Sequence, residues 1–215
     1  MEYQTPKSTC RLCGSEFARR GITRHLQSCL GKHLNAKSKG KVQALIHLHV
    51  QDAFNPDYFL YLLMAARAPL AVLDAYLRET WLECCGHLSA FSLERYGEEI
   101  QKGASIGDVF VSVGSLSYEY DFGSTTELTI RELGRFRGVL EQKIQLIARN
   151  SAPIIPCSEC EANPAVTICT ECIWEGAGYL CANCEKSHEC DEEMRLPVVN
   201  SPRTGICSYA GHLTE

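Results

Sequence analysis

The sequence predicts an α+β fold in which a central mixed domain is flanked by two small cysteine-rich modules. Three observations support this prediction. Cysteines and histidines gather in residues 1–34 and 157–215, residues 42–150 mix strand-like alternation with one helical repeat, and short polar or proline-containing segments separate the three parts. With 215 residues, of which 45% are hydrophobic, the chain can build one ordinary core with small satellite modules.

The amino-terminal module carries four residues with the spacing of metal ligands. Cys10 and Cys13 are separated by two residues, so both thiolates can reach one ion from a tight turn. His25 and Cys29 follow at positions i and i+4, which share one face of a helix. This pattern is typical of a tetrahedral Zn(II) site.

Two apolar residues extend the resemblance to a ββα zinc finger. Phe17 and Ile22 occupy its small-core positions, although Cys13 and His25 are one residue closer than usual and a cysteine replaces the second histidine. Polar residues near the expected helix start could contact nucleic acid there: Arg19, Arg20, Thr23 and Arg24. The alternative is a zinc-stabilised knuckle that contacts protein, because a single finger binds DNA weakly.

A basic linker (residues 35–41) leads into the central domain, whose elements follow in order. Residues 42–50 predict a strand with one hydrated face, on which His47 and His49 lie, and residues 58–64 predict a second strand. Pro69 opens a helix in which apolar residues recur at helical spacing, namely Leu70, Leu73, Leu77 and Trp81.

Further strands complete the domain. Gly86 ends the helix, residues 87–93 predict a strand, and residues 118–122 and 126–130 alternate around a Gly-Ser turn and predict a hairpin. A last strand is expected over residues 143–148, before a proline-containing hinge at residues 151–156. Strands with one long helix and mostly local hairpins favour α+β.

The carboxyl-terminal module contains three C-x2-C pairs followed by a histidine and a cysteine. We expect a binuclear zinc module over residues 157–215 with these ligands: Cys157, Cys160, Cys169, Cys172, Cys181, Cys184, His188 and Cys190. Alternating pairs predict a cross-braced site, with the first and third pairs on one ion and the second pair, His188 and Cys190 on the other. Sequential pairing stays open, and Cys207 or His212 could substitute for a ligand.

About three Zn(II) ions are therefore expected for the chain, all structural, because four-coordinate thiolate-rich sites leave no open position. The grouping of cysteines in close pairs favours metal turns over a secreted disulfide framework. No signal peptide is visible, and the longest apolar stretch is interrupted by Arg67, Pro69 and Asp74, so we expect no membrane association. A reducing, cytoplasmic setting follows.

Charge is distributed unevenly along the chain, whose net charge is −5. Residues 1–43 carry nine basic and two acidic residues, residues 44–150 carry nine and fourteen, and residues 151–215 carry three and ten. The positive charge of residues 1–43 favours contact with phosphate groups, whereas the negative charge of residues 151–215 would repel them.

Two central features invite a chemical interpretation. Cys84, Cys85 and His87 could form a Cys/His nucleophilic site, but buried thiols at a helix end explain them better, since sequence adjacency does not supply catalytic geometry. His47 and His49 could hold a metal, but no third ligand lies nearby in the sequence, so surface polarity is the preferred interpretation.

Several segments resemble the plasmid pRiA4b ORF-3-like family of prokaryotic proteins: residues 81–91, residues 118–128, and residues 196–203 with Gly205 and Cys207. The likeness covers residues 42–150 and, in zinc-bearing members, the tail. It implies an α+β domain found near plasmids and mobile elements, without an established activity or catalytic residues.

These patterns favour a non-enzymatic zinc-binding adaptor over an enzyme. The basic finger would contact DNA or RNA, and the acidic module would bind a protein, in a plasmid, mobile-element or defence context. One alternative is an enzyme or nuclease accessory with a small-ligand site around His87, Tyr118 and Asp121. Another is a purely protein-binding subunit of a larger complex.

Overall fold

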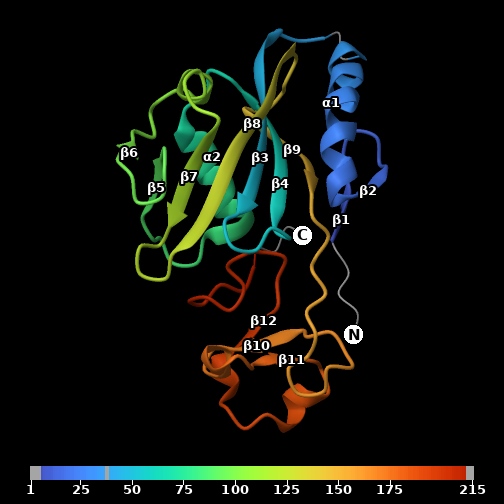
Figure 1. The fold of residues 1–215 in the computed structure, drawn as a ribbon, viewed down its shortest axis with the longest axis vertical. Helices are drawn as coiled ribbons and strands as arrows, with labels where there is room; N and C mark the ends of the chain where they lie inside the picture. Colours follow the sequence, from blue (N-terminus) through green and yellow to red (C-terminus); the bar gives the residue numbers. More distant parts are fainter. Residues whose placement is uncertain (1–5, 37–38, 212–215) are drawn as a thin grey trace.

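A computed structural model describes residues 6–36 and 39–211, and it confirms the predicted α+β fold (Figure 1). Its centre is a seven-stranded antiparallel sheet in the order β6-β5-β7-β8-β3-β4-β9. The strands are β3 (Gln43–Asp52), β4 (Phe59–Ala65), β5 (Ser89–Ser92), β6 (Glu99–Ile100), β7 (Ser115–Tyr120), β8 (Thr126–Gly138) and β9 (Ile144–Arg149). Among the described residues, no helix combines the length and apolar character that a bilayer crossing requires.

One face of the sheet is covered by the helix that Pro69 was expected to open. Pro69 is the N-cap of α2 (Leu70–Leu77), which continues as the π-helical turn η1 (Arg78–Leu82). The apolar residues at helical spacing are fully buried and form the main core with β3, β4, β7 and β8: Leu70, Leu73, Leu77 and Trp81. A short helix, α3 (Ile106–Val109), closes the end of this core.

The opposite face of the sheet is covered by α1 (Arg19–Ala36), which corrects the prediction of a hydrated face. Residues four apart along α1 form an apolar stripe that is buried against β3, β4 and β9: Ile22, Leu26, Leu30 and Leu34. His47 lies beneath this helix with 0% exposure, and His49 is half-buried. The finger helix is therefore part of the second core.

The amino-terminal hairpin is also tied to the central sheet. It consists of β1 (Lys7–Thr9) and β2 (Glu16–Ala18), which pair antiparallel. Ser8 forms a bridge with Asn150 just after β9, and its hydroxyl donates to the Arg149 carbonyl at 2.7 Å. The expected linker begins later than predicted, because α1 continues to Ala36, and residues 37–38 lie outside the described residues.

The carboxyl-terminal module has a three-stranded sheet in the order β11-β10-β12. Its elements are β10 (Thr167–Cys169), η2 (Cys172–Glu175), β11 (Tyr179–Leu180), η3 (Cys184–Ser187), η4 (Glu192–Met194) and β12 (Arg195–Pro197). After β12, residues 198–211 return to the central domain and lie between it and this small sheet (Figure 1). We call residues 198–211 the return segment.

Hydrogen bonds hold the return segment against the central core. The indole nitrogen of Trp81 donates to the Asn200 carbonyl at 3.1 Å, and the Ser201 hydroxyl donates to the Trp81 carbonyl at 2.6 Å. The Asn150 side-chain amide donates to Asn200 Oδ1, and the Asn200 side-chain amide donates to the Asn150 carbonyl. The predicted module over residues 157–215 thus divides into a metal-ligand part and a segment that belongs structurally to the central domain.

Candidate metal centres

The head cluster is formed by the turn after β1 and by one face of α1. Cys10 and Cys13 lie in a tight turn in which the Gly14 N–H donates to the Cys10 carbonyl at 2.7 Å, and Gly14 adopts a left-handed conformation with φ 77°. His25 and Cys29 lie one helical turn apart on α1. The Cys10 and Cys29 sulfurs are 3.8 Å apart, and the Cys13 sulfur lies 3.3 Å from His25 Nε2.

The first tail cluster combines two C-x2-C turns that are distant in sequence: Cys157, Cys160, Cys181 and Cys184. In each turn, the backbone N–H that follows the second cysteine donates to the carbonyl of the first at 3.0 Å, from Glu161 and from Glu185. The Cys160 and Cys181 sulfurs are 3.9 Å apart. The two turns face one another across a single candidate ion position.

The second tail cluster consists of the middle C-x2-C pair and the two ligands that follow η3: Cys169, Cys172, His188 and Cys190. The Cys172 sulfur lies 3.6 Å from both His188 Nε2 and the Cys190 sulfur. The Arg195 guanidinium organises this loop by donating to the carbonyls of His188 and Cys190 at 2.9 and 2.7 Å. The ligands are therefore grouped in the alternating, cross-braced order rather than sequentially.

A fourth group lies outside both predicted modules: Cys84, Cys85, His87 and Cys207. Sequence reasoning interpreted Cys84 and Cys85 as buried thiols and left Cys207 as a spare ligand for the tail. The structure instead leaves Cys85 exposed and brings Cys207 to it, although they are 122 residues apart. The other spare residue, His212, lies outside the described residues.

Each of the four groups brings together four donor atoms that could hold a metal ion. In each, the four ligand atoms lie within 4.8 Å of one another. Tetrahedral ligands at a Zn–S distance of about 2.3 Å would be about 3.8 Å apart, which is close to the observed separations. Sulfur donors, joined by one imidazole nitrogen in three of the groups, are ligands that Zn(II) accepts readily.

Each group also contains at least one thiol with a lowered pKa. Hydrogen bonds from the Ser15 hydroxyl and backbone lower the pKa of Cys13 to about 6, and the bond with His87 does the same for Cys207. Burial opposes ionisation of Cys157 and Cys169, but backbone N–H groups outweigh it and lower their pKa to about 6 and about 7. Because thiolate is the metal ligand, these environments favour metal binding at neutral pH.

The residues predicted to contact nucleic acid divide into two pairs. Arg19 donates to the Gln51 side chain at 3.0 Å, and the Thr23 hydroxyl lies 2.6 Å from that of Tyr61, so both are engaged with the central sheet. Arg20 and Arg24 are exposed. Of the four residues predicted to contact nucleic acid, only Arg20 and Arg24 therefore remain exposed near the start of α1.

A denser basic surface gathers at one end of the sheet, which we call the basic end. Antiparallel pairing brings the start of β3, the end of β4, the end of β8 and the start of β9 together there. Its exposed cations are Lys39, Lys41, Arg67, Arg137 and Lys143. Glu141, also exposed, is the one acidic residue among the described residues 39–43, 66–68 and 136–143.

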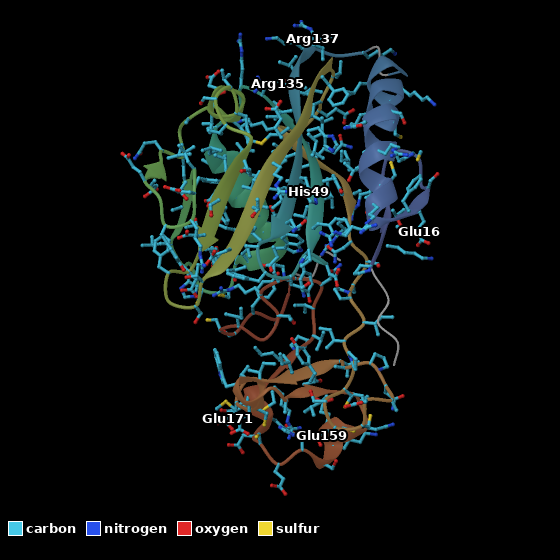
Figure 2. All side chains as sticks on the ribbon, viewed as in Figure 1. Glu16, His49, Arg135, Arg137, Glu159 and Glu171 are labelled. Carbon is cyan, nitrogen blue, oxygen red and sulfur yellow. The ribbon has the colours of Figure 1, made fainter. Side chains whose placement is uncertain are left out.

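The acidic residues of the tail module lie at the other end of the molecule. Figure 2 places Arg137 at the end of the central domain that is farthest from the tail module, which carries Glu159 and Glu171. The uneven charge along the chain is thus also a separation in space.

The three residues considered for a small-ligand site do not converge. His87 Nδ1 lies 3.4 Å from Asp121 Oδ1 beside the fourth cluster, whereas the buried Tyr118 hydroxyl donates to Asp74 at 2.9 Å inside the main core. His87 and Asp121 therefore lie together, while the Tyr118 hydroxyl is bonded to Asp74 in the core.

Comparisons with known proteins add little. No family model and no curated protein matches the chain. One similar solved structure is that of a protein of unknown function from Methanosarcina mazei Go1, with 16% identity and a TM-score of 0.41 over 52% of this chain and 70% of that one. A similarity this weak supports no conclusion about fold or function.

Proposed function

We propose that the chain is a non-enzymatic, zinc-stabilised adaptor that binds nucleic acid through its basic end and protein through its acidic tail module. The Cys/His clusters support the zinc part of the proposal, because their donors and spacing fit closed tetrahedral sites. Such sites stabilise small modules and offer no catalytic position, which favours an adaptor over an enzyme.

The observation that carries the nucleic-acid part is the basic end. Five exposed cations come from four different segments, and the sheet register holds those segments side by side. Three of these cations, Arg67, Arg137 and Lys143, belong to the central domain, whose overall charge is negative. A rigid cluster of cations on an otherwise acidic protein is the electrostatic footprint expected for phosphates.

A binding titration at low and at physiological ionic strength tests this part, with a short DNA duplex and an RNA strand as probes. The variant carries Arg67→Ala, Arg137→Ala and Lys143→Ala together. If each residue contacts one phosphate, the logarithmic salt slope on duplex DNA should fall by about 2.7, because each contact contributes about 0.9. Lys186→Ala, an exposed cation on the acidic module, is the matched control and should bind like wild type.

A second variant separates the basic end from the finger. Arg20→Ala with Arg24→Ala removes the exposed cations near the start of α1 and leaves Arg19 and Thr23 on the sheet. Loss of binding in this variant alone would assign the contact to the finger helix instead. Absence of binding by the wild type at low salt would refute nucleic-acid contact altogether and favour the purely protein-binding subunit.

The protein-binding part of the proposal is supported by an exposed aromatic residue. Trp174 in η2 is 87% exposed, in a module (residues 157–197) with nine acidic and two basic residues. Trp174 is the most exposed of the large hydrophobic side chains in the described part of the chain, and tryptophan is enriched where interfaces carry most of their binding energy. A partner with a basic segment and an apolar pocket would match this surface, and Trp174→Ala should weaken its capture without changing metal content.

A further inference from the structure

The fourth cluster differs from the other three in where its ligands come from. Cys84, Cys85 and His87 lie in the turn between η1 and β5 of the central domain, whereas Cys207 belongs to the return segment. In the other clusters, all ligands lie within one cysteine-rich module. An ion here would therefore join two parts of the chain instead of stabilising one of them.

Three of four separations between the ligand atoms match the distance of about 3.5–3.8 Å expected between ligands of one tetrahedral ion, and the fourth, between Cys85 and His87, is shorter. The sulfur of Cys85 lies 3.7 Å from that of Cys84 and 3.5 Å from that of Cys207. The Cys207 sulfur is 3.7 Å from His87 Nε2, and the Cys85 sulfur is 2.9 Å from the same nitrogen. Disulfide sulfurs would be about 2.05 Å apart, so the thiols are arranged around a common point rather than bonded in pairs.

A second set of contacts orients the histidine as a metal ligand. His87 Nε2 faces the sulfurs, while Nδ1 lies 3.4 Å from the Asp121 carboxylate. Metal-bound histidines commonly donate their other ring N–H to a carboxylate, which fixes the tautomer and the ring direction. Asp121 is itself held in place, since its other oxygen accepts a hydrogen bond from Arg203 at 2.5 Å.

The charges around the cluster also fit a bound ion. Three thiolates with Zn(II) would carry one net negative charge, which a nearby cation can balance. The Arg203 guanidinium is fully buried, and its Nη2 lies 3.6 Å from the Cys84 sulfur. It can therefore balance the thiolates as well as pair with Asp121.

The backbone of the return segment is shaped to bring Cys207 to this position. Cys207 adopts a left-handed conformation with φ 55°, which is uncommon for a residue other than glycine. Two residues earlier, Gly205 has φ 75° and packs so closely on β10 that a Cβ would lie 2.5 Å from Ile168 Cδ1. The turn that presents Cys207 thus also contacts the small sheet of the tail module.

We propose that Cys84, Cys85, His87 and Cys207 bind a fourth Zn(II) ion, which fastens the return segment to the central domain and so fixes the position of the tail module. The inference is independent of nucleic-acid binding, because it rests on the ligand geometry alone. Removing this ion would loosen the return segment around Cys207, while the hydrogen bonds of Asn200 and Ser201 to Trp81 and the Arg203–Asp121 pair remain. The central sheet and the other three sites would stay intact.

Native mass spectrometry combined with amide hydrogen exchange tests the proposal. Wild type should hold four zinc ions and Cys207→Ser three, while the neighbouring exposed control Ser208→Ala should keep four. Exchange in residues 198–211 should rise in Cys207→Ser only. Three ions in wild type, four in Cys207→Ser, or a mass lower by two hydrogens from a disulfide would overturn the proposal.

A titration of wild type with a chelator also tests whether the fourth ion holds the return segment, without the need for a variant. Cys85 and Cys207 are exposed, so the fourth ion should leave first. At the stage where one ion is lost, exchange should rise in residues 198–211 and stay unchanged in residues 157–197. If it rises first in residues 157–197, the labile ion belongs to the tail module and the fourth site does not act as a fastener.

Discussion

The guanidinium of Arg203 and the carboxylate of Asp121 form a buried ion pair, with Nη2 and Oδ2 2.5 Å apart. Arg203 comes from the return segment, and Asp121 follows β7 in the hairpin turn of the central domain. Arg203 also donates to the Ser124 carbonyl and the Thr126 hydroxyl. The pair therefore joins the last part of the chain to the central sheet beside the fourth cluster.

Removing one partner of this pair should be strongly destabilising. Arg203→Met leaves Asp121, which is 6% exposed, without its counterion, and breaking a buried pair costs about 3–5 kcal/mol. Adding Asp121→Asn should recover part of the loss, because asparagine is neutral and tolerates the left-handed φ of 64°. Urea unfolding measures both variants. Equal stability of Arg203→Met and wild type would show that the pair is not buried in solution.

The packing of α1 on the sheet predicts a large effect from a residue of the finger helix. Leu26 is fully buried in the second core, so Leu26→Ala should lower the free energy of unfolding by about 2–5 kcal/mol. Gln27→Ala is the matched control on the exposed side of the same helix and should change it by less than about 0.5 kcal/mol. A small effect of Leu26→Ala on the unfolding of the central domain would mean that the finger is an independent module.

Substitution of a metal-ligating cysteine in the tail module should destabilise that module and leave the central domain folded. Cys169→Ser removes a thiolate from the second tail cluster, and in so small a module metal binding supplies much of the folding free energy. Limited proteolysis should then cut within residues 157–197 while the central domain resists. Glu189→Gln, an exposed change nearby, should leave the digestion pattern as in wild type. Equal protection in both variants would argue against Cys169 as a ligand.

His47 should make stability depend on pH. Burial, with a smaller effect of the His49 charge, lowers the pKa of His47 to about 4, against about 6.5 in the unfolded chain. Because the folded pKa is depressed, the full stability is present above pH 6.5 and is lost as the pH falls toward 4, by about 3 kcal/mol. Neither ring nitrogen of His47 has a hydrogen-bond partner among the described residues.

His47→Leu should remove the loss of folding stability that occurs in wild type between pH 6.5 and 4. It should also raise stability slightly at neutral pH, since an unsatisfied buried polar group is replaced by an apolar one. Denaturant unfolding of wild type and variant at several pH values measures the difference. Protonation of the metal ligands affects both proteins alike and cancels in the comparison. Parallel stability curves for the two proteins would mean that His47 is solvated in the folded state.

Local patterns in the sequence were sufficient to predict much of this structure. The C-x2-C pairs with their closing residues lie within short segments, so the grouping of Cys157 with Cys181 could be anticipated from alternation alone. The helix after Pro69 could likewise be predicted from the spacing of Leu70, Leu73 and Leu77. Both depend on residues that are close in the chain.

Contacts between distant segments were missed for the same reason. Cys85 and Cys207 are 122 residues apart, and only the folded chain brings them together. The burial of His47 depends on α1, whose apolar stripe extends past Ile22 to Leu26, Leu30 and Leu34. That stripe is longer than a lone finger needs, and it was the sequence signal that the helix packs on another surface.

Anomalous diffraction measured above and below the zinc absorption edge would test the metal assignment most directly. Four peaks are expected, each about 2.3 Å from cysteine sulfurs and about 2.0–2.1 Å from any histidine nitrogen of its cluster. One peak should lie between Cys84, Cys85, His87 and Cys207, and the others at the head cluster and the two tail clusters. Peaks absent from the clusters, or disulfides in their place, would contradict a zinc-stabilised fold.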